Sequence, residues 1–208
     1  MGTAEIAALL APYIELDEKR LAGISIYINV LLKWNARMNL TAVRDPRQIV
    51  QRHFGESFFA ARKMLGPEDA LTIVDLGSGA GFPGLPIAMC VPRSEVTLIE
   101  SQSKKAAFLN EVIRSLDLKN AQVFSQRAES YTGTAELVTM RAVERFEAVL
   151  PTAAKLVKPG GRLALMIGAA QVESAVTLLP ELVRQEAIPV PGGHSRVLLV
   201  GTKIVKVE

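Results

Sequence analysis

Hydrophobic residues recur at two different spacings along the chain, and the change falls near residue 70. In the first part, apolar positions lie three or four residues apart, which is the period of a helix. This spacing predicts a short helix over residues 3–11. It also predicts a longer helix from Asp17, which can cap the first turn, to about Ala36. The apolar stripe of the longer helix consists of Leu21, Ile24, Ile28 and Leu31.

A third helix is predicted to begin at Asp45 and Pro46, because Asp is a good cap and Pro is favoured in the first turn. It runs to about Leu65, where a Gly-Pro pair ends it. Residues 34–41 break the helical period between the second and third helices. We therefore expect residues 1–70 to form an N-terminal helical appendage.

After residue 70, short apolar runs alternate with longer amphipathic segments. The predicted strands are residues 71–76, 95–100, 121–125, 136–140 and 162–167. The predicted helices are residues 84–91, 103–117, 145–157 and 171–180. Residues 158–161 are predicted to form a turn before the fifth strand. Two β-rich segments, 182–190 and 195–205, are separated by a hairpin-like connection that contains Pro189, Pro191, Gly192 and Gly193.

Strands separated by helices imply βαβ units and a mostly parallel sheet. A final antiparallel hairpin is typical of the class I methyltransferase version of this Rossmann-like α/β fold, so residues 71–208 are expected to form one domain with a seven-stranded sheet. Ligands bind such sheets at the carboxyl ends of the strands. Five segments at those ends are therefore expected to surround one crevice: residues 77–82, 100–101, 126–129, 140–142 and 166–168.

The most informative of these segments is the glycine loop, residues 77–84, because its glycines permit φ > 0 and the close approach of a ligand to the main chain. The dinucleotide fingerprint G-x-G-x-x-G would need a glycine at position 82, where this chain has Phe82. The G-x-G-x-G variant favours a ligand without a pyrophosphate, usually S-adenosylmethionine, although a plain structural turn is the alternative. The candidate cofactor-binding residues here are Gly77, Ser78, Gly79, Gly81 and Phe82.

Glu100 is a second cofactor-binding candidate. It ends the second predicted strand, about 20 residues after the glycine loop, where a carboxylate accepts hydrogen bonds from ribose hydroxyls. The alternative is a solvated carboxylate at a strand end. Since the glycine loop is also present, we favour the ribose role.

The net charge of the chain is only +3, but the charge is unevenly distributed. From Lys33 to Lys63 there are seven basic and two acidic residues, which gives that stretch a charge of +5 and the rest −2. A local basic surface is expected where a phosphate backbone binds, although a solvated helical face would show the same charges.

Composition excludes several other classes. Two histidines and one cysteine are too few and too far apart to predict a metal site. Cys90 lies in an apolar segment, which favours a buried thiol. A single cysteine cannot form an internal disulfide, which fits a reducing cytoplasm. Residues 1–15 lack the basic region of a signal peptide, and the longest apolar helical run, residues 21–32, is too short to span a bilayer. We expect a cytoplasmic protein with no metal and no membrane partner.

Several segments together resemble one bacterial family, the RsmG or glucose-inhibited division protein B family of 16S ribosomal RNA guanine-N7 methyltransferases. The resemblance extends from about Trp34 to the C-terminus. Its most specific element is Pro83-Gly84 in the glycine loop, combined with Asn39-Leu40-Thr41 and Arg52-His53. The other matching residues are Asn35, Ser57, Asp75, Glu100, Lys104, Lys105, Phe108, Leu109, Arg127, Ala128, Glu129, Arg141 and Ala142.

The resemblance implies that a guanine of 16S rRNA, in free RNA or in the small ribosomal subunit, receives the methyl group of S-adenosylmethionine, which becomes S-adenosylhomocysteine. It assigns the donor pocket to Gly77, Phe82, Ala128, Glu129 and Arg141. We expect a monomer. The candidate RNA-binding residues are Arg52, His53, Ser57, Lys104 and Lys105. The alternatives are that the first three close the pocket and that the two lysines lie on a solvated helical face.

Guanine N7 carries a lone pair at neutral pH, so it can attack the methyl group without a general base, and catalysis is mainly positioning. Arg141 follows the fourth predicted strand and is the candidate positioning residue; an ion pair with Glu129 or Glu144 is the structural alternative. His53 is equally compatible with a purely structural role. Trp34 is predicted to anchor a helix end in the core, with stacking on a base as the alternative.

The chain departs from the family pattern at two places. Glu56 stands where the family usually has Asp, and Met166-Ile167-Gly168 stands where many members have Lys-Gly. The competing functions are a small-molecule methyltransferase and an RNA-binding ribosome assembly factor that retains the fold. A nicotinamide-dependent oxidoreductase is disfavoured by Phe82.

Overall fold

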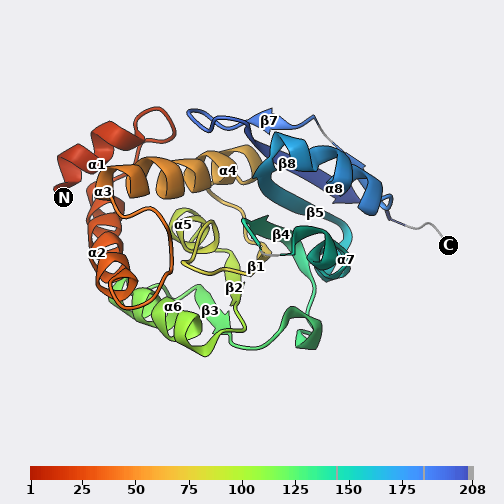
Figure 1. The fold of residues 1–208 in the computed structure, drawn as a ribbon, viewed down its shortest axis with the longest axis horizontal. Coiled ribbons are helices and arrows are strands. Elements are labelled where there is room, and N and C mark those ends of the chain that lie inside the picture. Colours follow the sequence, from red (N-terminus) through yellow and green to blue (C-terminus); the bar gives the residue numbers. More distant parts are fainter. Residues whose placement is uncertain (144, 185, 206–208) are drawn as a thin grey trace.

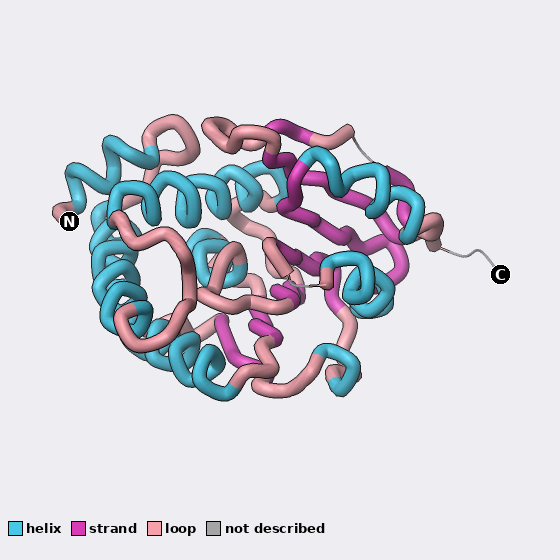
Figure 2. Tube along the Cα trace, in the orientation of Figure 1, coloured by secondary structure: helices cyan, strands magenta, loops and turns pink. Residues whose placement is uncertain are grey.

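The computed structural model describes residues 1–143, 145–184 and 186–205. It shows a twisted sheet between two layers of helices (Figure 1). The N-terminal helices lie together on one side of the molecule, and the strands of the sheet lie beside them (Figure 2).

The sheet contains five parallel strands and an antiparallel edge. In order along the sheet the strands are β3, β2, β1, β4, β5, β8 and β6, and β7 also pairs with β8. Strands β1 to β5 run parallel, and β8 runs antiparallel to β5. The bounds are β1 Thr72–Leu76, β2 Glu95–Ile99, β3 Ala121–Phe124, β4 Ala135–Arg141, β5 Val157–Gly168, β6 Leu182–Arg184, β7 Ile188–Pro189 and β8 Arg196–Lys203.

The expected sheet is confirmed, with one correction to the strand count. Among the residues that the structure describes, the sheet has eight strands rather than seven, because β6 and β7 pair with different parts of β8: β6 with residues 201–203 and β7 with residues 197–198. The two short strands therefore share one edge position. The predicted hairpin is the β7–β8 connection. The predicted turn at residues 158–161 lies inside β5 as an irregularity, where Ala135 pairs with Val157 and Leu137 pairs with Arg162.

The N-terminal helices begin at the predicted caps. The Asp17 carboxylate accepts from Arg20 N at 2.8 Å at the start of α2, and Asp45 accepts from Gln48 N at 2.8 Å at the start of α3. The third predicted helix is not uniform, however, because its middle is a π-helix, η1, at Ile49–Gly55. The helices are α1 Thr3–Leu10, α2 Glu18–Asn35, α3 Pro46–Gln48 and α4 Glu56–Met64.

The remaining helices cover the two faces of the sheet. They are α5 Gly84–Cys90, α6 Ser103–Ser115, α7 Phe146–Leu156 and α8 Val172–Leu178, with short 3-10 turns η2 Ala128–Ser130 and η3 Ala169–Gln171. Side chains alternate between the faces along each strand, so Ile73 and Val74 of β1 belong to different cores. Ile73 shares its core with the N-terminal helices, α5 and α6, whereas Val74 packs with α7 and α8.

The hydrophobic core continues across the expected boundary at residue 70. Phe54 and Phe58 from the N-terminal helices are fully buried in one cluster with Ile73, Leu98 and Leu137 from the sheet. The N-terminal helices thus form the layer that covers one face of the sheet, and they also bring side chains to the carboxyl ends of the strands.

Candidate functional site

The glycine loop folds back on the neighbouring strand. It follows β1, and both Gly77 N and Ser78 N donate to Ile99 O of β2, at 3.0 and 3.1 Å. The Ser78 hydroxyl donates to Asp75 O at 2.9 Å. Gly77, Gly79 and Gly81 all have positive φ, at 70°, 54° and 86°. The sequence forms this tight turn because glycine adopts these angles without steric cost.

The three glycines face different surroundings. A Cβ on Gly79 would meet Gly77 O at 3.7 Å, which is an ordinary contact, so its Cα faces open space on the cavity side. A Cβ on Gly81 would collide with the Tyr27 hydroxyl and lie 2.6 Å from Leu85. Gly81 was expected to contact the cofactor. The structure instead buries it against α2, and it does not line the cavity described below.

This difference predicts that two alanine substitutions affect stability and ligand binding to different extents. Gly81→Ala should lower the free energy of unfolding by about 2 kcal/mol or more, since overpacking typically costs about 1–3 kcal/mol and positive φ adds strain. Gly79→Ala should cost only about 1 kcal/mol, the αL penalty, yet weaken ligand binding. Denaturant unfolding and ligand titration of both variants test this. Equal stability losses would contradict it.

Asp75 lies buried beneath the loop. Its Oδ1 accepts from Thr139 Oγ1 at 2.7 Å, and its Oδ2 has no hydrogen-bond partner among the described residues. Burial raises the pKa of Asp75 to about 6. A Cβ on Gly84 would lie 2.7 Å from Asp75 Oδ2, so glycine at position 84 allows α5 to begin against this carboxylate.

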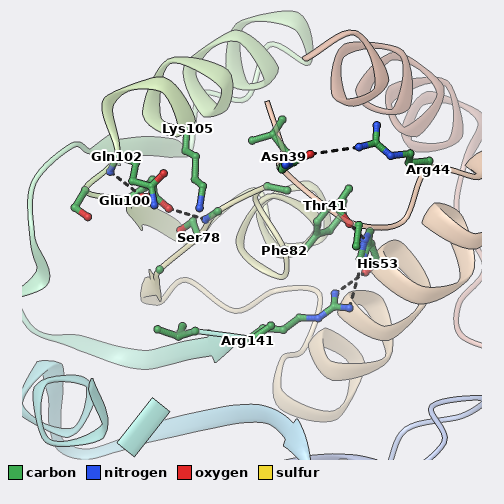
Figure 3. A pocket seen from close by; sticks show the side chains of 18 residues that line it. Asn39, Thr41, Arg44, His53, Ser78, Phe82, Glu100, Gln102, Lys105 and Arg141 are labelled. Atoms are coloured by element: carbon green, nitrogen blue, oxygen red, sulfur yellow. Dashed lines mark hydrogen bonds between the residues drawn. The ribbon is translucent and has the colours of Figure 1, made fainter. Parts of the chain in front are cut away.

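A cavity of about 890 Å³ opens at the carboxyl ends of β1, β2 and β4 (Figure 3). Its walls come from five parts of the chain: the segment after α2, the π-helix, the glycine loop, the residues that follow β2, and the end of β4 with the residues after it. The lining residues are Asn39, Leu40, Thr41, Ala42, Arg44, His53, Gly77, Ser78, Gly79, Ala80, Phe82, Glu100, Ser101, Gln102, Lys105, Arg141, Ala142 and Val143.

The Glu100 carboxylate joins the glycine loop to the start of α6. Its Oε2 accepts from Gly79 N at 3.0 Å, and its Oε1 accepts from Gln102 N at 2.8 Å. Each carboxylate oxygen has a second lone pair, so both can still accept from a ligand hydroxyl. Glu100 is 6% exposed and lines the cavity, and its two hydrogen bonds hold its oxygens in place at the cavity wall.

One wall of the cavity is a segment that sequence reasoning did not assign to the site. Residues 39–44 are held by the buried Asn35 side chain, whose Oδ1 accepts from Leu40 N and Thr41 N, while its Nδ2 donates to Thr41 O. Arg44 donates to Asn39 Oδ1 at 3.3 Å (Figure 3). Asn35 and the Asn-Leu-Thr motif were recognised only as marks of a family. The signal that could have assigned them to the site is that they are polar residues in an irregular stretch between two helices.

Phe82 packs between two other rings while still lining the cavity. It stacks on Tyr27 with centroids 5.3 Å apart and on His53 with centroids 4.9 Å apart. The Tyr27 hydroxyl donates to Ala80 O at 2.6 Å. This aromatic stack fixes the end of the glycine loop against α2 and η1. Phe82 therefore has a structural role in addition to its position at the cavity.

The hydrogen bonds of His53 determine its tautomer. Arg141 Nη2 lies 3.2 Å from His53 Nδ1, and a guanidinium can only donate, so Nδ1 is the acceptor. The ring proton is then on Nε2 and is donated to Thr41 Oγ1 at 2.8 Å. Burial, followed by the positive charges of Arg141, Arg52 and Arg196, lowers the pKa of His53 to about 3. His53 is therefore neutral in the folded protein.

This neutral histidine predicts acid sensitivity. Unfolded His53 gains its proton near pH 6.5, whereas folded His53 gains it only near pH 3, so the His53 contribution to stability is lost as the pH falls from about 6.5 to 3. At pH 4.5 the loss should be about 2–3 kcal/mol relative to pH 7. His53→Gln should reduce this loss, as measured by urea unfolding across pH. Asp75 acts in the opposite direction but is common to both proteins. Parallel pH curves for the two proteins would contradict the prediction.

Arg141 belongs to a buried ion-pair cluster with Glu56 and Arg196. Arg141 Nη2 lies 3.0 Å from Glu56 Oε2, and Arg196 Nη2 lies 2.6 Å from Glu56 Oε1. Arg141 Nη2 also donates to Arg52 O at 2.9 Å. Glu56, rather than Glu129, is thus the ion-pair partner, and Glu144 lies outside the described residues. The cluster connects η1, α4, β4 and β8 behind the cavity wall.

The residue after Arg141 has a strained backbone. Ala142 has φ of 49°, a left-handed conformation that is uncommon for a residue with a Cβ. It lines the cavity, as does Val143, whose methyl group would lie 2.9 Å from a Cβ on Gly77. Such outliers concentrate at functional sites, where the surrounding structure holds them.

The predicted RNA-binding residues do not share one environment. Arg52 is exposed, but Ser57 is fully buried and its hydroxyl donates to His53 O at 2.6 Å, which contradicts direct contact with RNA. The two adjacent lysines also separate. Lys105 extends from α6 toward the glycine loop (Figure 3) and lines the cavity, whereas Lys104 lines a second, smaller cavity.

Three of the five predicted segments surround the cavity, and two do not. The segments after β1, β2 and β4 contribute lining residues. Ala128 and Glu129 form part of the η2 turn, and neither they nor residues 166–168 are among the residues that line the cavity. The assignment of Ala128 and Glu129 to the donor pocket depends on the family resemblance.

Two further properties concern metals and membranes. In the described residues, His, Cys, Asp and Glu side chains do not gather in any group of three or more that could hold a metal ion. Within the same part of the chain, no helix has both the length and the apolar character required to cross a bilayer.

A family model and individual relatives agree on the family that this chain resembles. A family model described as rRNA small subunit methyltransferase G matches residues 20–189. A ribosomal RNA small subunit methyltransferase G from Xylella fastidiosa is 38% identical over 178 residues, covering 85% of this chain and 82% of the relative. A protein of the same name from Xanthomonas axonopodis pv. citri is 41% identical over 155 residues, covering 74% of this chain and 71% of the relative.

Comparison with solved structures supports the fold. A SAM-dependent O-methyltransferase from Thermotoga maritima superposes with a TM-score of 0.60 at 20% identity, covering 86% of this chain and 72% of that one. A ribosomal protein L11 methylase from Lactobacillus delbrueckii subsp. bulgaricus superposes with a TM-score of 0.61 at 12% identity, covering 74% of this chain and 80% of that one. The class I methyltransferase fold expected from the sequence is confirmed.

Proposed function

From the premise that this chain belongs to the rRNA small subunit methyltransferase G family, we propose that it methylates N7 of a guanine in 16S ribosomal RNA. It is a methyltransferase that uses S-adenosylmethionine and acts on small-subunit ribosomal RNA. The observation that carries this conclusion is the family match over residues 20–189, which includes all of the residues that line the cavity.

The residues of the cavity suit S-adenosylmethionine. The volume of the cavity, about 890 Å³, lies within the range of small-molecule sites, roughly 300–1,000 Å³. The Glu100 carboxylate can accept from the ribose hydroxyls, and the open backbone at Gly79 lets the donor approach the loop closely. When bound, the donor supplies a methyl group activated by its sulfonium charge.

The proposed reaction needs no proton transfer before the methyl group moves. The N7 lone pair forms the new N–C bond as the C–S bond breaks, so the positive charge passes from sulfur to the guanine ring. The chain's task is to hold N7, the methyl carbon and sulfur in line. The β4 end provides a rigid surface for this, because Arg141 is fixed by Glu56 and by Arg52 O.

The charged groups at the β4 end are held in fixed positions. His53 is neutral, and Arg141 is paired with the Glu56 carboxylate, which Arg196 also contacts. We propose that Arg141 positions the base or the donor, and that His53 orients Thr41 at the cavity. A monomer in the cytoplasm is the proposed state of the protein.

The experiment that tests the function is methyl transfer from labelled S-adenosylmethionine to ribosomal RNA from cells that lack the enzyme, followed by nucleoside analysis. Labelled 7-methylguanosine confined to small-subunit RNA is the expected result. Free RNA and intact subunits are tested in parallel to identify the form of the substrate. Donor binding without labelling of either would overturn the proposal and favour a small-molecule methyltransferase or an assembly factor.

A further inference from the structure

A second cavity lies between the end of α2 and the first three turns of α6. Its volume is about 400 Å³, and it is lined by Lys33, Trp34, Arg37, Met38, Lys104 and Glu111. We call it the tryptophan groove. Its walls combine one large aromatic ring and a thioether with three cations and one carboxylate, so its net charge is +2.

The tryptophan groove and the main cavity are neighbours along two stretches of chain. Met38 lines the groove and Asn39 lines the main cavity; likewise Lys104 lines the groove and Lys105 lines the main cavity. Because adjacent Cα atoms are about 3.8 Å apart, the walls of the two cavities are built from directly neighbouring residues.

Trp34 is held in place but remains on the groove wall. Its Nε1 donates to Glu111 Oε2 at 2.8 Å, and its ring meets Phe108 edge-on, with centroids 5.9 Å apart. Trp34 thus has the anchoring role expected from the sequence. Both oxygens of the Glu111 carboxylate are engaged, because Oε2 accepts from Trp34 and Oε1 lies 3.9 Å from Lys33 Nζ. The cations Arg37 and Lys104 are exposed beside the ring.

We propose that the tryptophan groove binds a single-stranded nucleotide that flanks the guanosine in the main cavity. The base stacks on Trp34, and its phosphates contact Lys33, Arg37 and Lys104. An aromatic face beside several cations is the combination that binds single-stranded nucleic acid, whereas phosphate alone has no need of the ring. This inference rests on the proposed function, since RNA must reach the main cavity.

The single tryptophan of the chain makes the proposal directly measurable. The intact protein is titrated with a short single-stranded RNA, and Trp34 emission is followed. We expect saturable quenching by RNA and none by inorganic phosphate at equal ionic strength. Displacement of the RNA by phosphate as effective as that by mononucleotide would reduce the groove to a simple anion site and overturn the proposal.

Charge variants keep the proposal testable if changes at Trp34 impair folding. Arg37→Ala with Lys104→Ala removes two exposed cations, so the slope of log affinity against log salt should fall by about 1.4, or about 0.7 for each phosphate that is no longer neutralised. The KM for ribosomal RNA should rise at least fivefold while donor affinity stays unchanged. Lys119→Ala, which changes an exposed lysine beyond the other end of α6, is the matched control and should alter neither.

The two proposals can fail separately. Lack of methyl transfer by the unaltered protein would overturn the proposed function, and the fluorescence titration would still show whether RNA stacks on Trp34. Efficient methylation of ribosomal RNA, together with unquenched Trp34 emission and an unchanged salt slope in the double variant, would overturn the inference about the groove alone.

Discussion

Glu100→Ala is expected to raise the dissociation constant for S-adenosylmethionine by about 10- to 100-fold, because hydrogen bonds to charged groups contribute about 1.5–3 kcal/mol. Two contributions of Glu100 to donor binding would be lost. Its oxygens hold Gly79 N and Gln102 N, which shapes the pocket, and they can accept from the ribose of the donor. Isothermal titration calorimetry with S-adenosylmethionine measures the effect.

Glu100→Gln separates charge from size. The amide has one acceptor oxygen, and its NH2 group would face a backbone N–H of Gly79 or Gln102 that also donates. We therefore expect Glu100→Gln to lose most of the affinity that Glu100→Ala loses. Glu95→Gln is the matched control, because Glu95 is exposed at the opposite end of the same strand. Donor affinity within threefold of the unaltered protein in both Glu100 variants would show that Glu100 does not bind the donor.

Glu56→Ala is expected to lower the free energy of unfolding by about 3–5 kcal/mol, since removing one partner of a buried ion pair leaves uncompensated charge. Here two guanidinium groups, those of Arg141 and Arg196, would lose the same carboxylate. Methyl transfer should fall as well, because Arg141 would no longer be fixed at the cavity. Denaturant unfolding gives the first quantity, and kcat with saturating donor gives the second.

Glu56→Asp tests the geometry of the cluster. Aspartate, which the family usually has at this position, keeps the charge but is shorter by one methylene. It should still pair with one of the two arginines but not reach the other, with an intermediate stability loss of about 1–2 kcal/mol. Glu68→Gln breaks an exposed pair with Arg93 and should change stability by less than about 1 kcal/mol. A Glu56→Ala loss as small as that of Glu68→Gln would contradict the role assigned to the cluster.

The sequence by itself determined the architecture and the chemistry of the donor side. Helical spacing before residue 70 and alternating strands and helices after it predicted the layers, because these patterns are local and have fixed periods. The glycine loop and Glu100 were recognisable for the same reason. Gly81 packs against Tyr27 and is not among the residues that line the cavity, and a motif does not show which glycine faces a ligand and which faces a neighbouring side chain.

Only the tertiary structure decided which residues complete the site. Arg141 and Glu56 lie 85 positions apart in the chain, and no local pattern relates them. The burial of Ser57, the neutral state of His53 and the cavity wall at residues 39–44 depend in the same way on how the N-terminal helices pack against the sheet. The physical reason is that periodicity reports which face of an element is apolar, whereas hydrogen bonds and ion pairs between distant segments arise only once those faces have packed.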